Sequence, residues 1–267
     1  MRPLTFTLKA APQQRLDLSP LTPDRLEGLD AKAVAALELQ TTKEKITAGD
    51  LFKISFGDIS TIRIIGGLSR FDAIGEGMTH GAIQVEGDAG ARLGRNLSGG
   101  AIAVTGDAGV WAGSGMKAGR ITIGRNAGDW IGGPLAGEMA GMSGGLIHVK
   151  GNAGAEAGQR LRRGTMVIGG NAGAYAGRGL IAGTLIIGGN AGKLPGYLMK
   201  RGTIVVGGRV ERFSETFADC GPVDLAFLML LRRTLEKDGV LPPKLFARPK
   251  HRWGGDMAVL GKGEIFA

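Results

Sequence analysis

Short segments in which apolar and polar residues alternate recur along the middle of the chain. Each has two aliphatic residues separated by one position, as in Ile83-x-Val85. The same pattern returns at Ile102-x-Val104, Ile121-x-Ile123, Ile147-x-Val149, Met166-x-Ile168, Leu185-x-Ile187 and Ile204-x-Val206. A period of two residues predicts a β-strand with one buried face. Ile62-x-Ile64 fits a degenerate first copy.

A second pattern keeps step with these segments. An Asx-Ala-Gly motif begins at Asp88, Asp107, Asn126, Asn152, Asn171 and Asn190. Successive motifs are 19 residues apart, except for one step of 26 that holds an insertion around Pro134–Glu138. Glycines recur at fixed offsets from each motif, which fits tight corners that need positive φ angles. Stacked Asx side chains can hydrogen-bond the neighbouring backbone, so we interpret this series as structural.

These regularities predict an all-β fold, a single-stranded right-handed parallel β-helix of about eight coils with a 19-residue repeat. Residues 1–55 are expected to form a short α/β N-terminal cap segment, 56–210 the glycine-rich β-helix, and 211–267 a C-terminal helix and extended tail. The two ends of a β-helix must be covered, because exposed strand edges promote aggregation. Helices are predicted around 30–40 and over 222–237. The second has Val223, Ala226, Phe227, Leu230 and Leu231 on one side.

Composition narrows the class of protein. Glycine accounts for 49 of 267 residues, 43% of the chain is apolar, and the net charge is +9. These values exclude a disordered chain, and the glycine spacing excludes collagen. The sequence has no apolar run of membrane-spanning length and no secretory signal, and Cys220 is its single cysteine. We therefore predict a cytoplasmic protein without a disulfide and without a membrane or nucleic-acid partner.

Catalytic chemistry is poorly represented in this sequence. The three histidines, His80, His148 and His251, show no metal-binding spacing, and the carboxylates of the repeats are scattered. No strand–glycine–helix unit supports a dinucleotide site. We therefore expect no catalytic, cofactor-binding or metal-binding residue in this chain. An autonomous acyltransferase of the hexapeptide class is an alternative, but its coils need multiples of six residues.

Two candidate interaction surfaces stand out. No Asp or Glu occurs between Ala157 and Gly208. The basic residues proposed for an anion or partner contact are Arg160, Arg162, Arg163, Arg178, Lys200 and Arg201, with Lys193 in the same stretch. An acidic subunit, or a polyglutamate or phosphate tail, would fit them, as would a merely solvated basic surface. Nucleic acid is disfavoured, because no aromatic residues interleave to stack bases.

The second candidate is an apolar stripe on the face of the strands that should meet water. The residue between the two buried aliphatic positions of each segment should point outward. In three successive copies this residue is aliphatic, at Val167, Ile186 and Val205. A contiguous apolar stripe of this kind is normally covered. Either the C-terminal helix covers it, through Phe227 and Leu231, or it docks another subunit, and the sequence leaves both possibilities open.

The repeat Gly151-Asn152-Ala153-Gly154-Ala155-Glu156-Ala157-Gly158 and the leader Ala48-Gly49-Asp50-Leu51-Phe52 carry a family resemblance. Residues 46–210 resemble the C subunits of formylmethanofuran dehydrogenase and of the bacterial formyltransferase/hydrolase complex. They also resemble the glycine-rich (GXGXG) C-terminal domain of glutamate synthase.

This resemblance implies a non-catalytic scaffold subunit of a complex in one-carbon metabolism linked to tetrahydromethanopterin and methanofuran, such as formaldehyde oxidation in methylotrophy. The implied partners are amidohydrolase-like, formyltransferase and dehydrogenase-B-like subunits, and the polyglutamyl tail of a furan cofactor. The cofactors, a methanofuran analogue and tetrahydromethanopterin, would belong to the complex and not to this chain alone. The alternatives are the C subunit of a tungsten or molybdenum formylmethanofuran dehydrogenase and a glutamate-synthase-type interaction domain.

Overall fold

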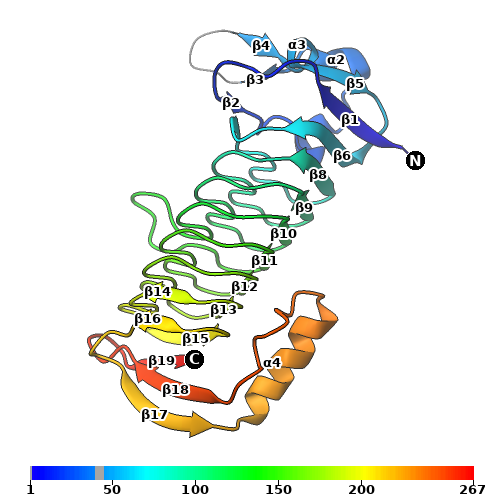
Figure 1. Ribbon diagram of the computed structural model, residues 1–267. Coiled ribbons are helices and arrows are strands. Elements are labelled where there is room, and N and C mark those ends of the chain that lie inside the picture. Colours follow the sequence, from blue (N-terminus) through cyan, green and yellow to red (C-terminus); the bar gives the residue numbers. More distant parts are fainter. Residues whose placement is uncertain (1, 40–44) are drawn as a thin grey trace.

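One large sheet organises the molecule. The computed structural model describes residues 2–39 and 45–267. Its main sheet has 13 strands in the order β17-β18-β19-β15-β13-β12-β11-β10-β9-β8-β6-β1-β5, and these follow one another down the length of the molecule (Figure 1). No helix within the described ranges is long and apolar enough to cross a membrane.

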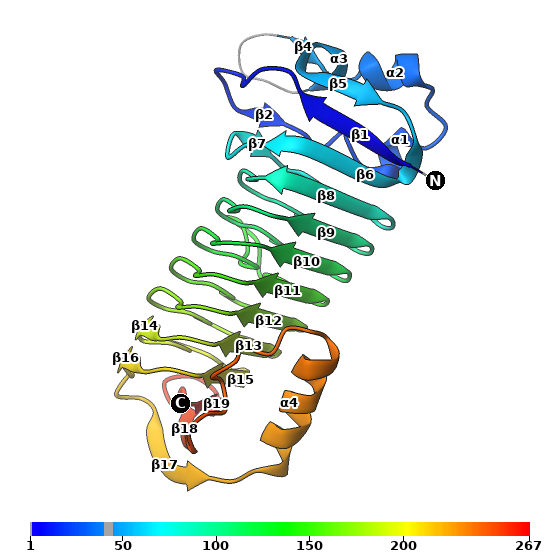
Figure 2. The same cartoon turned by 45° about the vertical axis from the view of Figure 1, so that its right-hand side comes forward.

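The middle of this sheet is parallel. Its strands are β6 (Asp58–Gly67), β8 (Ala82–Gly87), β9 (Ala101–Val104), β10 (Arg120–Ile123), β11 (Leu146–Val149), β12 (Thr165–Ile168), β13 (Thr184–Ile187) and β15 (Arg201–Val206). After each strand the chain makes a loop and returns to start the next strand beside it (Figure 2). The register follows the repeat, since Ile102 lies opposite Ile83 on one side and Ile121 on the other. We call residues at equivalent positions of successive repeats a column.

The N-terminal segment adds strands to one edge of this sheet. β1 (Pro3–Leu8) runs parallel to β6 and antiparallel to β5 (Phe52–Ser55). The smaller elements are β2 (Leu16–Asp17) with β7 (Phe71–Asp72), α1 (Pro23–Leu26), α2 (Ala31–Ala35), β3 (Glu38–Leu39) with β4 (Ile46–Thr47), and α3 (Ala48–Leu51). The helix expected around 30–40 is therefore shorter, and Gln40 lies outside the described residues.

The C-terminal segment extends the opposite edge. β14 (Ala191–Lys193) and β16 (Val210–Arg212) form a separate parallel pair. The chain then forms β17 (Ala218–Val223), α4 (Ala226–Lys237), β18 (Lys250–Gly255) and β19 (Lys262–Phe266). β19 is parallel to β15, whereas β18 is antiparallel to both β19 and β17.

The prediction of a single-stranded right-handed parallel β-helix is wrong. The 13-stranded sheet is mixed, because the pairs β1–β5, β18–β19 and β17–β18 are antiparallel. The physical reason lies at the two ends, where terminal segments satisfy the open strand edges by hydrogen-bonding to them. The repeat pattern covers only the parallel strands and does not report on segments that lack it.

The strands and loops enclose an apolar core. Ile83, Ile102, Ile121, Ile147 and the aliphatic residues that follow them in the same column are fully or almost fully buried. On the opposite side of each repeat the alanines of the Asx-Ala-Gly motifs form isolated parallel bridges, from Ala89 to Ala191. Each Asx oxygen accepts a hydrogen bond from the backbone N–H at the equivalent position of the next repeat, as Asp88 Oδ1 does from Asp107 N at 2.9 Å and Asn190 Oδ1 from Arg209 N at 2.8 Å. These bonds satisfy the backbone of corners that have no strand pairing.

Candidate interaction surface

The basic residues predicted to contact an anion fall into two groups. Arg178 pairs with Glu156 at 3.3 Å, and Lys193 pairs with Glu211 at 3.5 Å, so these two cations are neutralised within the chain. The others are exposed and have no ion pair among the described residues: Arg160, Arg162, Arg163, Lys200 and Arg201. The structure therefore leaves a smaller basic surface than the acid-free stretch of sequence predicts. We call these five residues the basic edge.

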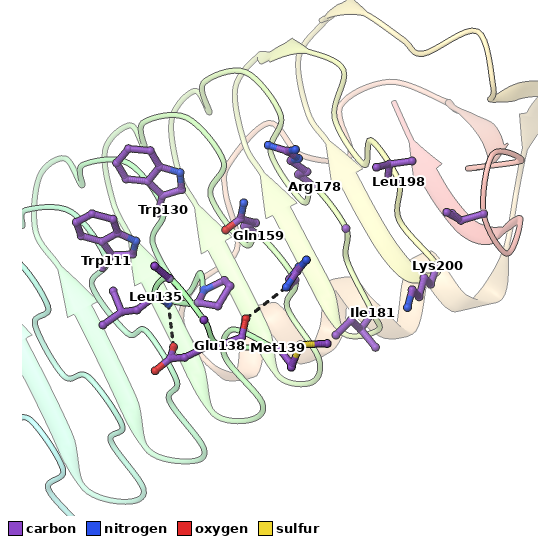
Figure 3. Close-up of a pocket in the computed structure, with 16 residues that line it drawn as sticks. Trp111, Trp130, Leu135, Glu138, Met139, Gln159, Arg178, Ile181, Leu198 and Lys200 are labelled. Atoms are coloured by element: carbon purple, nitrogen blue, oxygen red, sulfur yellow. Dashed lines mark hydrogen bonds between the residues drawn. The ribbon is translucent and has the colours of Figure 1, made fainter.

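A pocket of about 560 Å³ opens beside part of the basic edge. Arg160 and Lys200 line it, together with Arg178 and Gln159. The larger apolar side chains of its lining are those of Trp111, Trp130, Pro134, Leu135, Met139, Ile181, Leu198 and Val259 (Figure 3). Glu138 is the one carboxylate of this lining. The pocket thus combines large apolar side chains with free cations.

Two indoles form one wall of the pocket. Trp111 and Trp130 occupy the same position of successive repeats and stack with ring centroids 4.9 Å apart and planes 14° apart. Both have a φ of 56°. This backbone conformation lets the N–H of Trp111 bond Asp129 O at 3.0 Å and that of Trp130 bond Ala155 O at 2.9 Å in the following repeat.

The insertion in the repeat forms the other wall. Without Pro134–Ala140, the sequence Trp130-Ile131-Gly132-Gly133-Gly141-Met142 would match residues 111–116 in the preceding repeat. We call these seven residues the insertion loop. Its Glu138 accepts the Leu135 N–H at 2.8 Å and pairs with Arg95 at 2.7 Å. Burial raises the pKa of the Glu138 carboxyl, but the Leu135 N–H and Arg95 outweigh that effect and bring the pKa below its usual value.

The apolar stripe is covered by the chain itself. Val167, Ile186 and Val205 are fully buried in a second apolar cluster under α4. Leu228 and Leu235 of α4 and Phe266 of β19 belong to this cluster. The stripe is therefore not a surface for partner docking. The contact predicted through Phe227 and Leu231 holds in part: Leu231 packs against this cluster, whereas Phe227 is 42% exposed.

The histidines and the cysteine lie apart from the pocket lining. His148 is half-buried in β11, His80 lies 3.3 Å from Asp24, and His251 lies 3.4 Å from Asp219. Cys220 is exposed on β17. Within residues 2–39 and 45–267, no group of three or more His, Cys, Asp or Glu side chains could hold a metal ion.

The comparisons with known proteins identify the family. No family model matches the sequence. The chain is 54% identical over 262 residues to the C subunit of the formyltransferase/hydrolase complex Fhc of Methylorubrum extorquens, and the match covers 98% of both proteins. The chain belongs to the Fhc C-subunit family. The resemblance predicted from the repeat is thereby confirmed.

Structural and distant sequence relatives of the Fhc C-subunit family agree. A chain in the crystal structure of the formyltransferase/hydrolase complex (FhcABCD) from Methylorubrum extorquens with methylofuran superposes with a TM-score of 0.93. It is 39% identical, and the match covers 98% of each chain. The C subunit of molybdenum-containing formylmethanofuran dehydrogenase 1 from Methanothermobacter marburgensis is 37% identical over 81 residues, which is 30% of this chain and 20% of that protein.

Sequence reasoning did not find the pocket of this member of the Fhc C-subunit family, although two signals were present. Trp111 and Trp130 are 19 residues apart, so they had to be neighbours in any stack with that repeat. The seven-residue insertion follows Trp130 after only three residues. Together these features place an extra loop beside an aromatic pair.

Proposed function

We propose that this chain is a non-catalytic structural subunit of a formyltransferase/hydrolase complex, and that it binds other subunits of that complex. The whole-length similarity to the Fhc C subunit supports this proposal most strongly, because it includes both ends of the chain as well as the repeats. The solved relative belongs to a complex that contains methylofuran. We accordingly assign cofactor chemistry to the complex, and a supporting role to this chain.

The carboxylates of the repeats support a structural role. Asp107 Oδ1 accepts the backbone N–H of Asn126 at 2.7 Å, and Asp129 Oδ1 accepts that of Ala155 at 2.7 Å. Glu138 and Glu156 pair with Arg95 and Arg178. Side chains that could serve as acids or bases are thus held by contacts that maintain the stack.

The basic edge supports a contact with an anionic partner. Exposed cations without ion pairs raise the local positive potential and favour acidic surfaces. We propose that the basic edge contacts an acidic surface of another subunit. The methylofuran in the solved complex favours a second candidate, in which the edge retains a polyglutamyl tail of the furan cofactor.

Charge reversal tests both roles of the basic edge. The chain is co-produced with the other three subunits from its own organism, and the complex is purified through one of those subunits. In the variant, Arg162→Glu, Arg163→Glu, Lys200→Glu and Arg201→Glu are combined; the matched control reverses four exposed cations elsewhere, Lys32, Lys53, Arg125 and Lys150. We expect the variant to lose the complex or its furan cofactor at salt concentrations that the control tolerates.

The outcomes separate the proposals. Wild-type chain that never co-elutes with the other subunits contradicts the structural-subunit role. Loss of co-elution in the variant supports contact with an acidic subunit, and cofactor loss from an intact complex supports the tail. A variant complex that keeps its subunits and its cofactor as the control does contradicts both roles of the edge.

A further inference from the structure

The insertion loop adds nothing that the stack of repeats needs. Asn126 Oδ1 still accepts the Asn152 N–H at 3.0 Å across the insertion, and Ile121 still lies opposite Ile147 in the sheet. The strands on either side keep the register of a plain 19-residue step. Because the loop is dispensable for stacking, its contribution has to be sought at the surface.

The insertion loop is held in a defined shape. Glu138 Oε1 pairs with Arg95 Nη2, and Arg160 Nη1 donates to the Glu138 carbonyl at 3.3 Å. The same loop leaves the Met139 side chain 81% exposed at the mouth of the pocket. An anchored loop that presents a bare methionine is pre-organised for contact, since little conformational freedom remains to be lost on binding.

The aromatic wall shows the composition of a binding surface. A left-handed φ is energetically costly for a bulky residue. The hydrogen bonds of the repeat depend on this φ but not on the side chain, so they do not explain why tryptophan occupies these positions. Tyr175 occupies the same column as Trp111 and Trp130. The ring of Tyr197 packs against that of Tyr175, with a centroid distance of 6.0 Å. Three of the chain's five Trp and Tyr residues thus belong to this column, and Trp111 and Trp130 line the pocket. Trp, Tyr and Arg are the residues most enriched where binding energy concentrates.

We propose that the pocket between the insertion loop and the two indoles docks an acidic segment of another subunit, which inserts an apolar side chain beside Met139. This inference rests on the proposed function and names the place of contact. Arg160 and Lys200 at the lining have no ion pair among the described residues, and Glu138 is already bound to Arg95. A second copy of this chain would bring like charges together, so charge complementarity favours an acidic partner.

Two variants test the pocket, and circular dichroism checks that each remains folded. One deletes Pro134–Ala140 to restore a 19-residue repeat, and the other combines Trp111→Ala with Trp130→Ala. Binding of the wild-type chain and of each purified variant to the other three subunits is measured by titration. We expect at least about 30-fold weaker binding than wild type, the loss typical of a truncated hot spot. The matched control is Met229→Asp on α4, where an equally prominent methionine is 58% exposed.

The readings distinguish this inference from the proposed function. If wild-type chain does not bind the other subunits, the structural-subunit role fails. If wild type binds and both pocket variants bind equally well while remaining folded by circular dichroism, the pocket assignment fails and the structural role stands. Weakening by Met229→Asp alone would move the contact to α4 and overturn the inference.

Photo-crosslinking tests the chemistry of the occupant. Met139→p-benzoylphenylalanine is placed in the assembled complex, irradiated, and the linked peptide identified by mass spectrometry. A peptide of another subunit that has an apolar residue flanked by Asp or Glu supports the inference. A peptide from a second copy of this chain, a partner peptide without carboxylates, or the absence of any link in an intact complex would each overturn it.

Discussion

The side-chain oxygen of Asn126 accepts the backbone N–H of Asn152 at 3.0 Å, although 26 residues separate them. The equivalent bonds from Asn152 to Asn171 and from Asn171 to Asn190 span 19 residues and measure 2.8 and 2.7 Å. The geometry of this column is therefore independent of loop length. Each Asx side chain positions the backbone of the next repeat, and the connecting chain can vary without changing the stack.

The Asx column can be tested with a pair of substitutions at Asn171. Asn171→Ala removes the acceptor of the Asn190 N–H, and we expect a loss of about 1 kcal/mol in the free energy of unfolding. Asn171→Asp keeps an acceptor oxygen, as Asp107 does in the same column, and should cost clearly less. Urea denaturation followed by circular dichroism measures both. Equal losses in the two variants would show that the oxygen does not position the next repeat.

Gly119, which directly precedes β10, is required both by its positive φ and by the lack of room for a side chain. Gly119 has a φ of +87°, and a Cβ there would lie 2.6 Å from Gly100 O. Gly137 in the insertion loop has nearly the same φ, +86°, but open space around it. We expect Gly137→Ala to cost about 1–2 kcal/mol for the left-handed conformation. Gly119→Ala should cost a further ~1–3 kcal/mol for the clash.

Thermal unfolding of the two glycine variants measures the difference. Because the φ angles match, the strain of the left-handed conformation cancels between them. A lower Tm for Gly119→Ala isolates the close approach of successive repeats. Identical Tm values would mean that the stack relaxes around a methyl group at this corner.

The strands of the repeats could be predicted because their pattern is local. Ile83 and Val85 are both buried in β8, as the alternation of the segment indicates. The antiparallel ends could not be predicted in this way, since β17, β18 and β19 lack the repeat and pair across long stretches of sequence. Which segment hydrogen-bonds to the open edge of the sheet depends on the tertiary fold, and a short-range sequence pattern contains no information about it.

The packing of α4 was predicted only in part, for a different reason. Apolar residues surround its first turns, so periodicity alone does not select the face that meets the sheet. The structure buries Leu228 and Leu235 and packs Leu231 against the same cluster, but it leaves Phe227 and Leu230 exposed.

The number of free cations in the acid-free stretch was overestimated for a related reason. The acids that neutralise Arg178 and Lys193 are Glu156 and Glu211, just outside the acid-free stretch. In a stack of repeats, residues about 18 to 22 positions apart are neighbours in space, so a window on the sequence does not define a surface.

Leu235 provides a test of the cover over the stripe. Its side chain is 1% exposed and packs in the cluster with Val167, Ile186 and Val205. We expect Leu235→Ala to lower the free energy of unfolding by about 2–5 kcal/mol, through lost burial and a cavity. Leu230→Ala on the same helix, at a 60% exposed position, should change it by less than about 0.5 kcal/mol. Chemical denaturation compares them, and similar losses at both positions would contradict the packing of α4.

His148 makes stability depend on pH in a defined direction. It is half-buried in β11, and burial lowers its pKa from 6.5, with the charges of Arg120 and Lys150 lowering it further. As pH falls through 6.5, His148 becomes protonated in the unfolded chain but stays neutral in the folded protein. The free energy of unfolding therefore decreases until the pH passes the lowered pKa of the folded protein. His148→Gln lacks this titration. We expect the free energy of unfolding of wild type to fall relative to that of His148→Gln when the pH is lowered from 7.5 to 5.5. All other groups titrate in both proteins and cancel, so parallel stability curves over this range would show that the folded protein accepts the proton on His148 as readily as the unfolded chain does.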